Sequence, residues 1–299
     1  MKVTLIQMDV AWAGDKKLRE NVRKNHETAE KAMLAAEKSD LYVLPEMWNT
    51  GFVTTPENLF PEQGPTSVSP SSEGETGVGS ETLTWMQRMA DKLDAAVAGS
   101  VAVRLPDGSF RNRLFFVKPD TSPNPSPEAV GRESNCQPCE QSLSPRGKVW
   151  RGAFYDKHHL FTYGGEHLHY TPGEERVTME WRGVRLRLCT CYDLRFPLWL
   201  RCRDDYDALI CVASWPTVRM HAWRVLLQAR AIENQCYVLG VNRVGDDPVC
   251  QYSGGTAFVN PYGEMTACPE GEASVLTKTI DMEHLRTFRG KFPVLKEAD

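Results

Sequence analysis

The chain of 299 residues contains no apolar run that approaches the roughly 18 residues needed to span a membrane. It also lacks long runs of charge of one sign, because 35 Lys and Arg and 39 Asp and Glu residues are interspersed, for a net charge of −4. Without a basic patch, the electrostatic footprint of a nucleic-acid-binding protein is missing. We therefore expect a small-molecule partner, with no nucleic acid and no membrane.

The cysteines lack the loop spacing of a disulfide framework. There are nine, an odd number, and several lie inside apolar strand patterns: Cys189, Cys191, Cys211 and Cys236. A single CxxC pair at 136–139 has no second pair to complete a structural zinc site. We expect reduced thiols in a cytoplasmic protein, and no metal at this pair.

Strand and helix patterns alternate along nearly the whole chain, which predicts a layered α/β protein with one domain over 1–299. Residues 2–9 have too short an apolar stretch for a signal peptide and predict a first buried strand. Further strands are predicted at 41–46, 95–104, 110–118, 184–191, 207–214 and 236–244, and helices at 15–39, 81–93, after 197, and at 221–235.

Two stretches interrupt this alternation. Residues 61–80 are dominated by Pro, Ser, Gly, Thr and Glu, and residues 119–148 are rich in proline and have no aromatic side chain. Neither can bury enough apolar surface to offset the entropy of ordering. We predict a flexible loop at 61–80 and an insertion inside a hairpin at 119–148.

Three polar side chains are candidates for chemistry. Glu46 ends a buried strand, where α/β folds usually build their sites, and suits a general base, although a salt bridge is the alternative. Lys157 lies among aromatic and apolar neighbours, which suits an oxyanion-stabilising cation or a side chain that covers apolar surface. Glu166 follows nine residues later, in a Gly-rich loop.

Cys191 lies where a strand is predicted to turn into a helix. A thiol at a helix N-terminus is stabilised as the thiolate, which is the nucleophilic form. A cysteine that only packs in the core is the alternative.

Taken together, these motifs resemble the nitrilase superfamily of carbon-nitrogen hydrolases. The likeness covers nearly the whole chain in order and is greatest for the omega-amidase branch, which is similar to the eukaryotic Nit2 group. It is carried by the segments Leu44-Pro45-Glu46-Met47, Tyr155-Asp156-Lys157-His158-His159-Leu160-Phe161, Cys191-Tyr192-Asp193-Leu194-Arg195-Phe196-Pro197 and Ala213-Ser214-Trp215-Pro216.

The resemblance implies roles by matching position. Glu46 would be the general base, Cys191 the nucleophile, and Lys157 the cation that stabilises the oxyanion, assisted by the backbone N–H of Tyr192. Glu166 would position Lys157 and the substrate amide. The family fold is a four-layer αββα sandwich, usually paired in a homodimer or higher homo-oligomer.

Substrate-binding candidates lie in the same motifs. Arg195 follows Cys191 by four residues, about one helical turn, so its guanidinium would bind a substrate carboxylate or, equally, form a salt bridge between elements. Phe52, Trp215 and Pro216 are pocket walls by family position, with aromatic packing as the alternative.

The implied activity is the release of ammonia from a small carboxylate-bearing amide, such as 2-oxoglutaramate or 2-oxosuccinamate. The route is a cysteine thioester, with no metal or organic cofactor. Alternatives are another hydrolase of the superfamily, acting on an N-carbamoyl compound or a nitrile, and a non-catalytic binding protein on the same fold. The insertion departs from the pattern of the branch.

Overall fold

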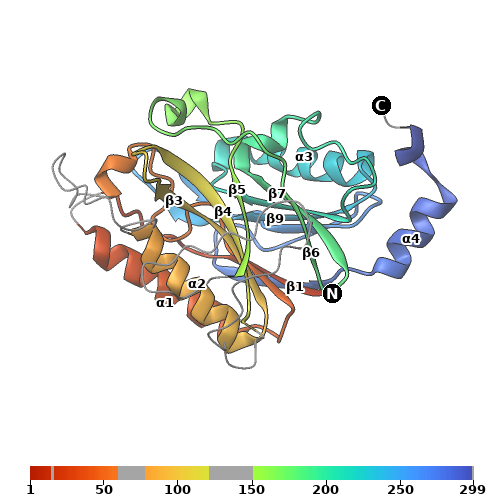
Figure 1. Ribbon diagram of the computed structural model, residues 1–299, viewed down its shortest axis with the longest axis horizontal. Helices are drawn as coiled ribbons and strands as arrows, with labels where there is room; N and C mark the ends of the chain where they lie inside the picture. The colour runs from red at the N-terminus through yellow and green to blue at the C-terminus, as the bar shows by residue number, and fades with distance from the viewer. Residues whose placement is uncertain (15–16, 60–77, 121–150, 298–299) are drawn as a thin grey trace, which may run out of the picture.

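The computed structural model describes residues 1–14, 17–59, 78–120 and 151–297. Two six-stranded sheets pack face to face, and helices cover their outer faces (Figure 1). The layers therefore follow the order α, β, β, α, which confirms the predicted sandwich. Among the described residues, no helix is both long enough and apolar enough to cross a bilayer.

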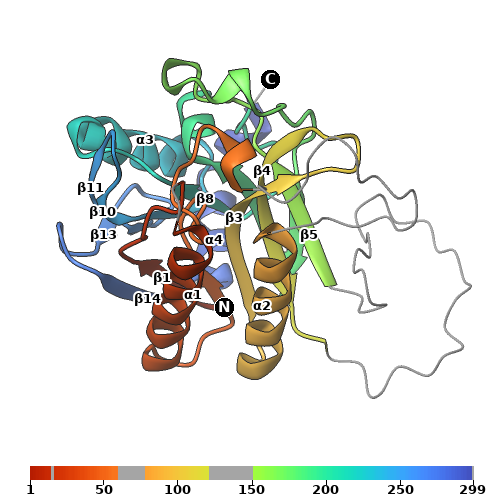
Figure 2. The same ribbon diagram turned by 90° about the vertical axis from the view of Figure 1, so that its left-hand side faces the viewer.

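The first sheet has the strand order β14-β1-β2-β3-β4-β5. Its strands are β1 (Lys2–Gln7), β2 (Leu41–Val43), β3 (Ala96–Arg104), β4 (Phe110–Lys118), β5 (Arg151–Asp156) and β14 (Ser274–Thr279). Strands β1, β2 and β3 run parallel, so each connection crosses over through a helix, α1 (Leu18–Ala35) or α2 (Val78–Leu93). These two helices lie side by side on the outer face of this sheet (Figure 2).

The second sheet has the order β13-β12-β9-β8-β7-β6. Its strands are β6 (Thr178–Trp181), β7 (Val184–Thr190), β8 (Ala208–Ala213), β9 (Tyr237–Asn242), β12 (Ala257–Val259) and β13 (Met265–Ala267). Helix α3 (Met220–Glu233) packs on its outer face, and α4 (Met282–Lys291) follows β14. A separate hairpin of β10 (Val244–Asp246) and β11 (Gln251–Ser253) projects beyond β9.

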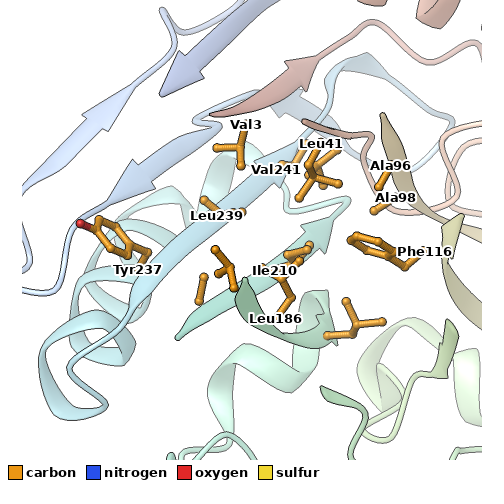
Figure 3. Close-up of a cluster of buried hydrophobic side chains, with 14 of the residues drawn as sticks. Val3, Leu41, Ala96, Ala98, Phe116, Leu186, Ile210, Tyr237, Leu239 and Val241 are labelled. Atoms are coloured by element: carbon orange, nitrogen blue, oxygen red, sulfur yellow. The ribbon is translucent and has the colours of Figure 1, made fainter. Parts of the chain in front are cut away.

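The main core lies between the two sheets (Figure 3). One sheet contributes Leu41 and Phe116, and the other contributes Ile210 and Leu239, all of which are completely buried. Each parallel strand is buried on both faces, because helices cover the outer face of its sheet. The sequences of these strands are therefore continuous apolar runs and do not alternate between apolar and polar residues. This arrangement brings the carboxyl ends of β2 and β7 to the same region of the molecule.

Two sequence predictions need correction. Helix α2 begins at Val78, so the last three residues of the stretch predicted as a loop are helical. The described residues 197–207 form no helix; a 3-10 helix, η4 (Cys191–Arg195), precedes Pro197 instead. The residue before a proline is disfavoured in the helical region, and Phe196 is extended at φ −111° and ψ 91°, which ends the helix.

The predicted hairpin is present, since β4 pairs antiparallel with β5 up to Lys118 and Arg151. The insertion that joins these strands, from 121 onwards, lies outside the described residues, as do residues 61–77 of the predicted loop and the CxxC pair.

Candidate active site

Glu46, Lys157 and Cys191 come from three separate segments and meet between the two sheets. Glu46 follows β2, Lys157 follows β5 by one residue, and Cys191 follows β7 directly. The Glu46 and Lys157 side chains are fully buried, whereas Cys191 is half-buried. The sequence prediction that Glu46 and Cys191 lie at strand ends is therefore correct.

Lys157 lies between two buried carboxylates. Its Nζ is 2.9 Å from Oε1 of Glu46 and 2.8 Å from Oε2 of Glu166. Burial lowers the pKa of Lys157, but the two carboxylates outweigh it and hold that pKa well above its usual value. The lysine is therefore a fixed ammonium group, and surface snorkelling does not describe it.

Backbone donors hold both carboxylates as well. Oε2 of Glu166 accepts a hydrogen bond from the backbone N–H of Phe161 at 2.6 Å. Oε2 of Glu46 accepts one from the backbone N–H of Ser214 at 2.8 Å. Burial, with the nearby Glu46 charge, raises the pKa of Glu166 despite the opposing effect of Lys157. Glu166 thus joins the cluster, as the sequence predicted.

Asn112 was missed by sequence reasoning. Its Nδ2 donates to Oε1 of Glu46 at 2.8 Å and to Oε1 of Glu166 at 3.1 Å, so one buried amide bridges both carboxylates. In the sequence Asn112 stands between Arg111 and Arg113 at the start of strand β4, so a polar side chain there gave no signal. Only its burial in the structure, where a polar group needs hydrogen-bond partners, indicates its place in the site.

Cys191 lies on a tight turn. Its φ is +48°, a left-handed conformation that non-glycine residues seldom adopt, and it opens η4 immediately after β7. The Asp193 carboxylate accepts from the backbone N–H of Thr190 at 3.0 Å and so stabilises the turn from below. The turn directs the thiol away from the end of β7 and into the cavity described below.

The ionisation of Cys191 differs from the sequence prediction. Burial, the negative charge of Glu46 and a hydrogen bond to it raise the pKa of the thiol well above its usual value, and Lys157 lowers it only in part. A 3-10 helix of five residues has too small a dipole to reverse this balance. The resting group is a thiol beside a carboxylate that can accept its proton.

A cavity of about 170 Å³ opens above the thiol. It is lined by every substrate-binding candidate from the sequence: Phe52, Tyr192, Arg195, Trp215 and Pro216. It is also lined by residues that sequence reasoning missed, among them Trp12, Arg219, Asp247, Cys250 and Tyr252. These come from loops far apart in the sequence, so periodicity gives no signal for them.

Arg195 has the environment of a binding residue. Its guanidinium carbon lies 5.0 Å from the centroid of the Trp215 ring. No carboxylate pairs with it among the described residues, so the salt-bridge alternative has no partner there.

The comparisons with known proteins agree with this geometry. The model of the carbon-nitrogen hydrolase family matches residues 2–290. The chain belongs to this family. It is a hydrolase that acts on amides.

Individual relatives in the carbon-nitrogen hydrolase family cover the full chain. An omega-amidase, YafV, from Yersinia enterocolitica is 35% identical, covering 100% of this chain and 97% of its own. A 2-oxoglutaramate amidase from Bacillus subtilis is 28% identical over 99% of this chain and 96% of its own. A CN-hydrolase superfamily protein from Xanthomonas campestris, solved with an arsenic adduct in its active site, has 31% identity and a TM-score of 0.77, covering 100% of this chain and 97% of its own.

The described part of this carbon-nitrogen hydrolase holds no group of three or more His, Cys, Asp or Glu side chains that is arranged to bind a metal. The Nδ1 atom of His169 lies 3.1 Å from Oε1 of Glu57. The seven cysteines of the described residues are all free thiols.

Proposed function

We propose that the protein releases ammonia from a small amide that carries a carboxylate, of the 2-oxoglutaramate or 2-oxosuccinamate type, through a thioester on Cys191. One observation carries the proposal: the Cys191 thiol and the Lys157 ammonium group line one cavity, and the buried Glu46 carboxylate contacts both of them. The names of the relatives, omega-amidase and 2-oxoglutaramate amidase, support the substrate class.

The first half of the reaction forms the thioester. Glu46 takes the proton of the Cys191 thiol while the sulfur attacks the amide carbon. The resulting oxyanion is stabilised by Lys157 and by the backbone N–H of Tyr192, which follows the nucleophile. The carbon-nitrogen bond then breaks, and the proton held by Glu46 passes to the leaving nitrogen, so ammonia departs.

The second half reverses these roles. Glu46 takes a proton from a water molecule that attacks the thioester carbon. Lys157 and the backbone N–H of Tyr192 stabilise the second oxyanion as they did the first. The carbon-sulfur bond breaks, the proton returns to the sulfur, and a carboxylic acid leaves. Glu166 accepts a hydrogen bond from Lys157, and Asn112 donates to both Glu46 and Glu166, so these two residues keep Lys157 and Glu46 in place.

Arg195 anchors the substrate carboxylate in this proposal. Its position over the Trp215 ring fixes a planar two-pronged donor on the cavity wall. A substrate held there places its amide over Cys191 only if it is short, because the cavity is small.

The test is ammonia release from a panel of substrates: 2-oxoglutaramate, its methyl ester, an N-carbamoyl amino acid and a simple nitrile. We expect the highest kcat/KM for 2-oxoglutaramate. Arg195→Ala should reduce kcat/KM for the acid by about 1.5–3 kcal/mol of transition-state stabilisation and spare the ester. Preference for the N-carbamoyl compound or the nitrile would establish the alternative hydrolases, and no turnover at all would favour a binding protein.

A second copy of the chain is the partner that we propose, as a homodimer or higher homo-oligomer. Light scattering of the purified protein measures its mass directly, and a mass of one chain across the micromolar range would contradict this proposal.

A further inference from the structure

The cavity contains a second arginine without an anionic partner. Arg219 lies at the N-terminal boundary of α3 and lines the cavity together with Arg195. Its guanidinium carbon is 5.3 Å from the centroid of the Phe161 ring, and it makes no ion pair with any described carboxylate. Guanidinium groups in such places usually have a carboxylate partner.

The other charges of the cavity are already matched. Lys157 is held by Glu46 and Glu166. The Asp247 carboxylate accepts from the Tyr252 hydroxyl at 2.6 Å and from two backbone N–H groups, so both of its oxygens are used. Two positive groups, Arg195 and Arg219, therefore remain for a bound molecule.

Trp215 fixes both arginines. Its ring lies under Arg195, and its Nε1 donates to the backbone carbonyl of Arg219 at 2.9 Å. The backbone of Trp215 is itself held by Asn242, whose Oδ1 accepts from its N–H at 2.7 Å and whose Nδ2 donates to its carbonyl at 2.9 Å. Because these contacts hold both arginines in place before binding, less conformational entropy is lost when the anion binds.

We infer that Arg219 is a specificity-determining residue that binds the distal carboxylate of the substrate together with Arg195. The inference rests on the proposed function and deepens it. The two guanidinium groups form one anion site opposite Cys191, so the cavity selects amides with an acidic far end. Neutral amides leave these two half-buried positive charges without an anionic partner, and this loss disfavours their binding.

The experiment compares Arg219→Met, Arg219→Lys and Arg224→Met on 2-oxoglutaramate and its methyl ester. Arg224 lies on the same helix but pairs with Glu270 and does not line the cavity, which makes it the matched control. We expect Arg219→Met to lower kcat/KM for the acid about 10- to 100-fold, mainly through KM, and to change the ester less than about threefold. Arg219→Lys should retain part of the preference because it keeps the charge but loses the planar fork.

Equal losses on acid and ester, or no loss on the acid, would overturn the role of Arg219. If the wild-type protein hydrolyses neither compound, the proposed function fails, and the anion site is then measured separately. Calorimetry of 2-oxoglutarate binding to Cys191→Ala should show a Kd weakened at least about tenfold by added Arg219→Met and unchanged by added Arg224→Met. An unchanged Kd in both would overturn the inference.

Discussion

The Oδ2 atom of Asp193 lies 2.7 Å from the hydroxyl of Tyr155, and this hydrogen bond joins the Cys191 turn to the strand that leads to Lys157. Oδ1 of the same carboxylate accepts from the backbone N–H of His159 at 2.8 Å. Asp193 is fully buried, so each of its oxygens depends on these donors. One carboxylate therefore sets the position of the nucleophile relative to the lysine.

Asp193→Asn is expected to lower kcat for amide hydrolysis by about 10- to 100-fold with little change in KM, because the amide nitrogen cannot accept the hydrogen bonds that align the two segments. Steady-state kinetics measures the split. Asp94→Asn, at an exposed turn, is the matched control. A rise in KM with unchanged kcat would show that Asp193 does not align the reacting groups.

Cys191→Ala should abolish hydrolysis while the protein stays folded, since the thioester route has no other nucleophile in this cluster. Circular dichroism and ammonia release measure the two properties. Residual activity within tenfold of wild type would refute the covalent mechanism.

Alkylation of Cys191 should depend on pH in a defined direction. Burial and Glu46 raise the pKa of this thiol, so the thiolate fraction at pH 7 is small and grows as pH rises. We expect iodoacetamide labelling of Cys191 to accelerate about tenfold per unit between pH 7 and 9. Glu46→Gln should speed labelling at pH 7 while abolishing hydrolysis, because it removes the negative charge and also the base. Mass spectrometry measures labelling at each cysteine, and slower labelling of that variant would contradict the electrostatic account.

Removal of the Lys157 ammonium should destabilise the fold. Lys157→Met leaves Glu46 and Glu166 buried without their cation, which costs about 3–5 kcal/mol of unfolding free energy. Urea denaturation at pH 7 measures the change. Addition of Glu166→Gln to this variant should restore part of the unfolding free energy, since one of the two buried negative charges is removed. A further loss of unfolding free energy would argue against unpaired charge as the cause.

Acid should destabilise the protein through His26. This side chain is 7% exposed and packs against the rings of Trp48 and Trp85, with each ring centroid 5.2 Å from its own. Burial, helped by Arg88, lowers its pKa from 6.5 to about 4. Below pH 6.5 the His26 side chain is protonated in the unfolded chain, whereas in the folded protein it stays neutral until about pH 4. The free energy of unfolding therefore falls as pH decreases through this window.

The expected loss between pH 7 and pH 5 from His26 alone is about 2 kcal/mol. Urea denaturation at both values measures it in wild type, in His26→Gln and in the control His221→Gln, whose side chain is exposed. The difference in unfolding free energy between pH 7 and pH 5 should become smaller only in His26→Gln. An equal difference in all three proteins would exclude His26 as its source.

Deletion of residues 124–145 should leave the fold intact. Strands β4 and β5 pair in register from Arg113 and Asp156 to Lys118 and Arg151, so the hairpin is held by its own ladder. A shorter connection also lowers the entropic cost of closing the loop between the two strands. Thermal unfolding followed by circular dichroism is the measurement, and a cooperative loss of folding would show that the segment is structural.

Local patterns determined much of this protein. The apolar runs that end at Glu46 and Cys191 were enough to place both at strand ends, because burial on two faces leaves a continuous run of apolar residues. The order of strands and helices followed from the same periodicity, as did the αββα sandwich once the family resemblance was added. The end of η4 at Arg195 is also local, since Pro197 restricts Phe196, although we had expected a helix beyond it.

Only the tertiary structure decided the chemical state of the site. Asn112, Ser214 and Glu46 lie far apart in the sequence, and their hydrogen bonds exist only because two sheets bring their strand ends together. The sequence suggested a thiolate at a helix N-terminus, but packing placed Cys191 beside Glu46 in a desolvated cavity, which favours the thiol. Charge and burial act through space, so pKa values and the presence of both Arg195 and Arg219 in the lining of one cavity are properties of the fold and not of any segment of the chain.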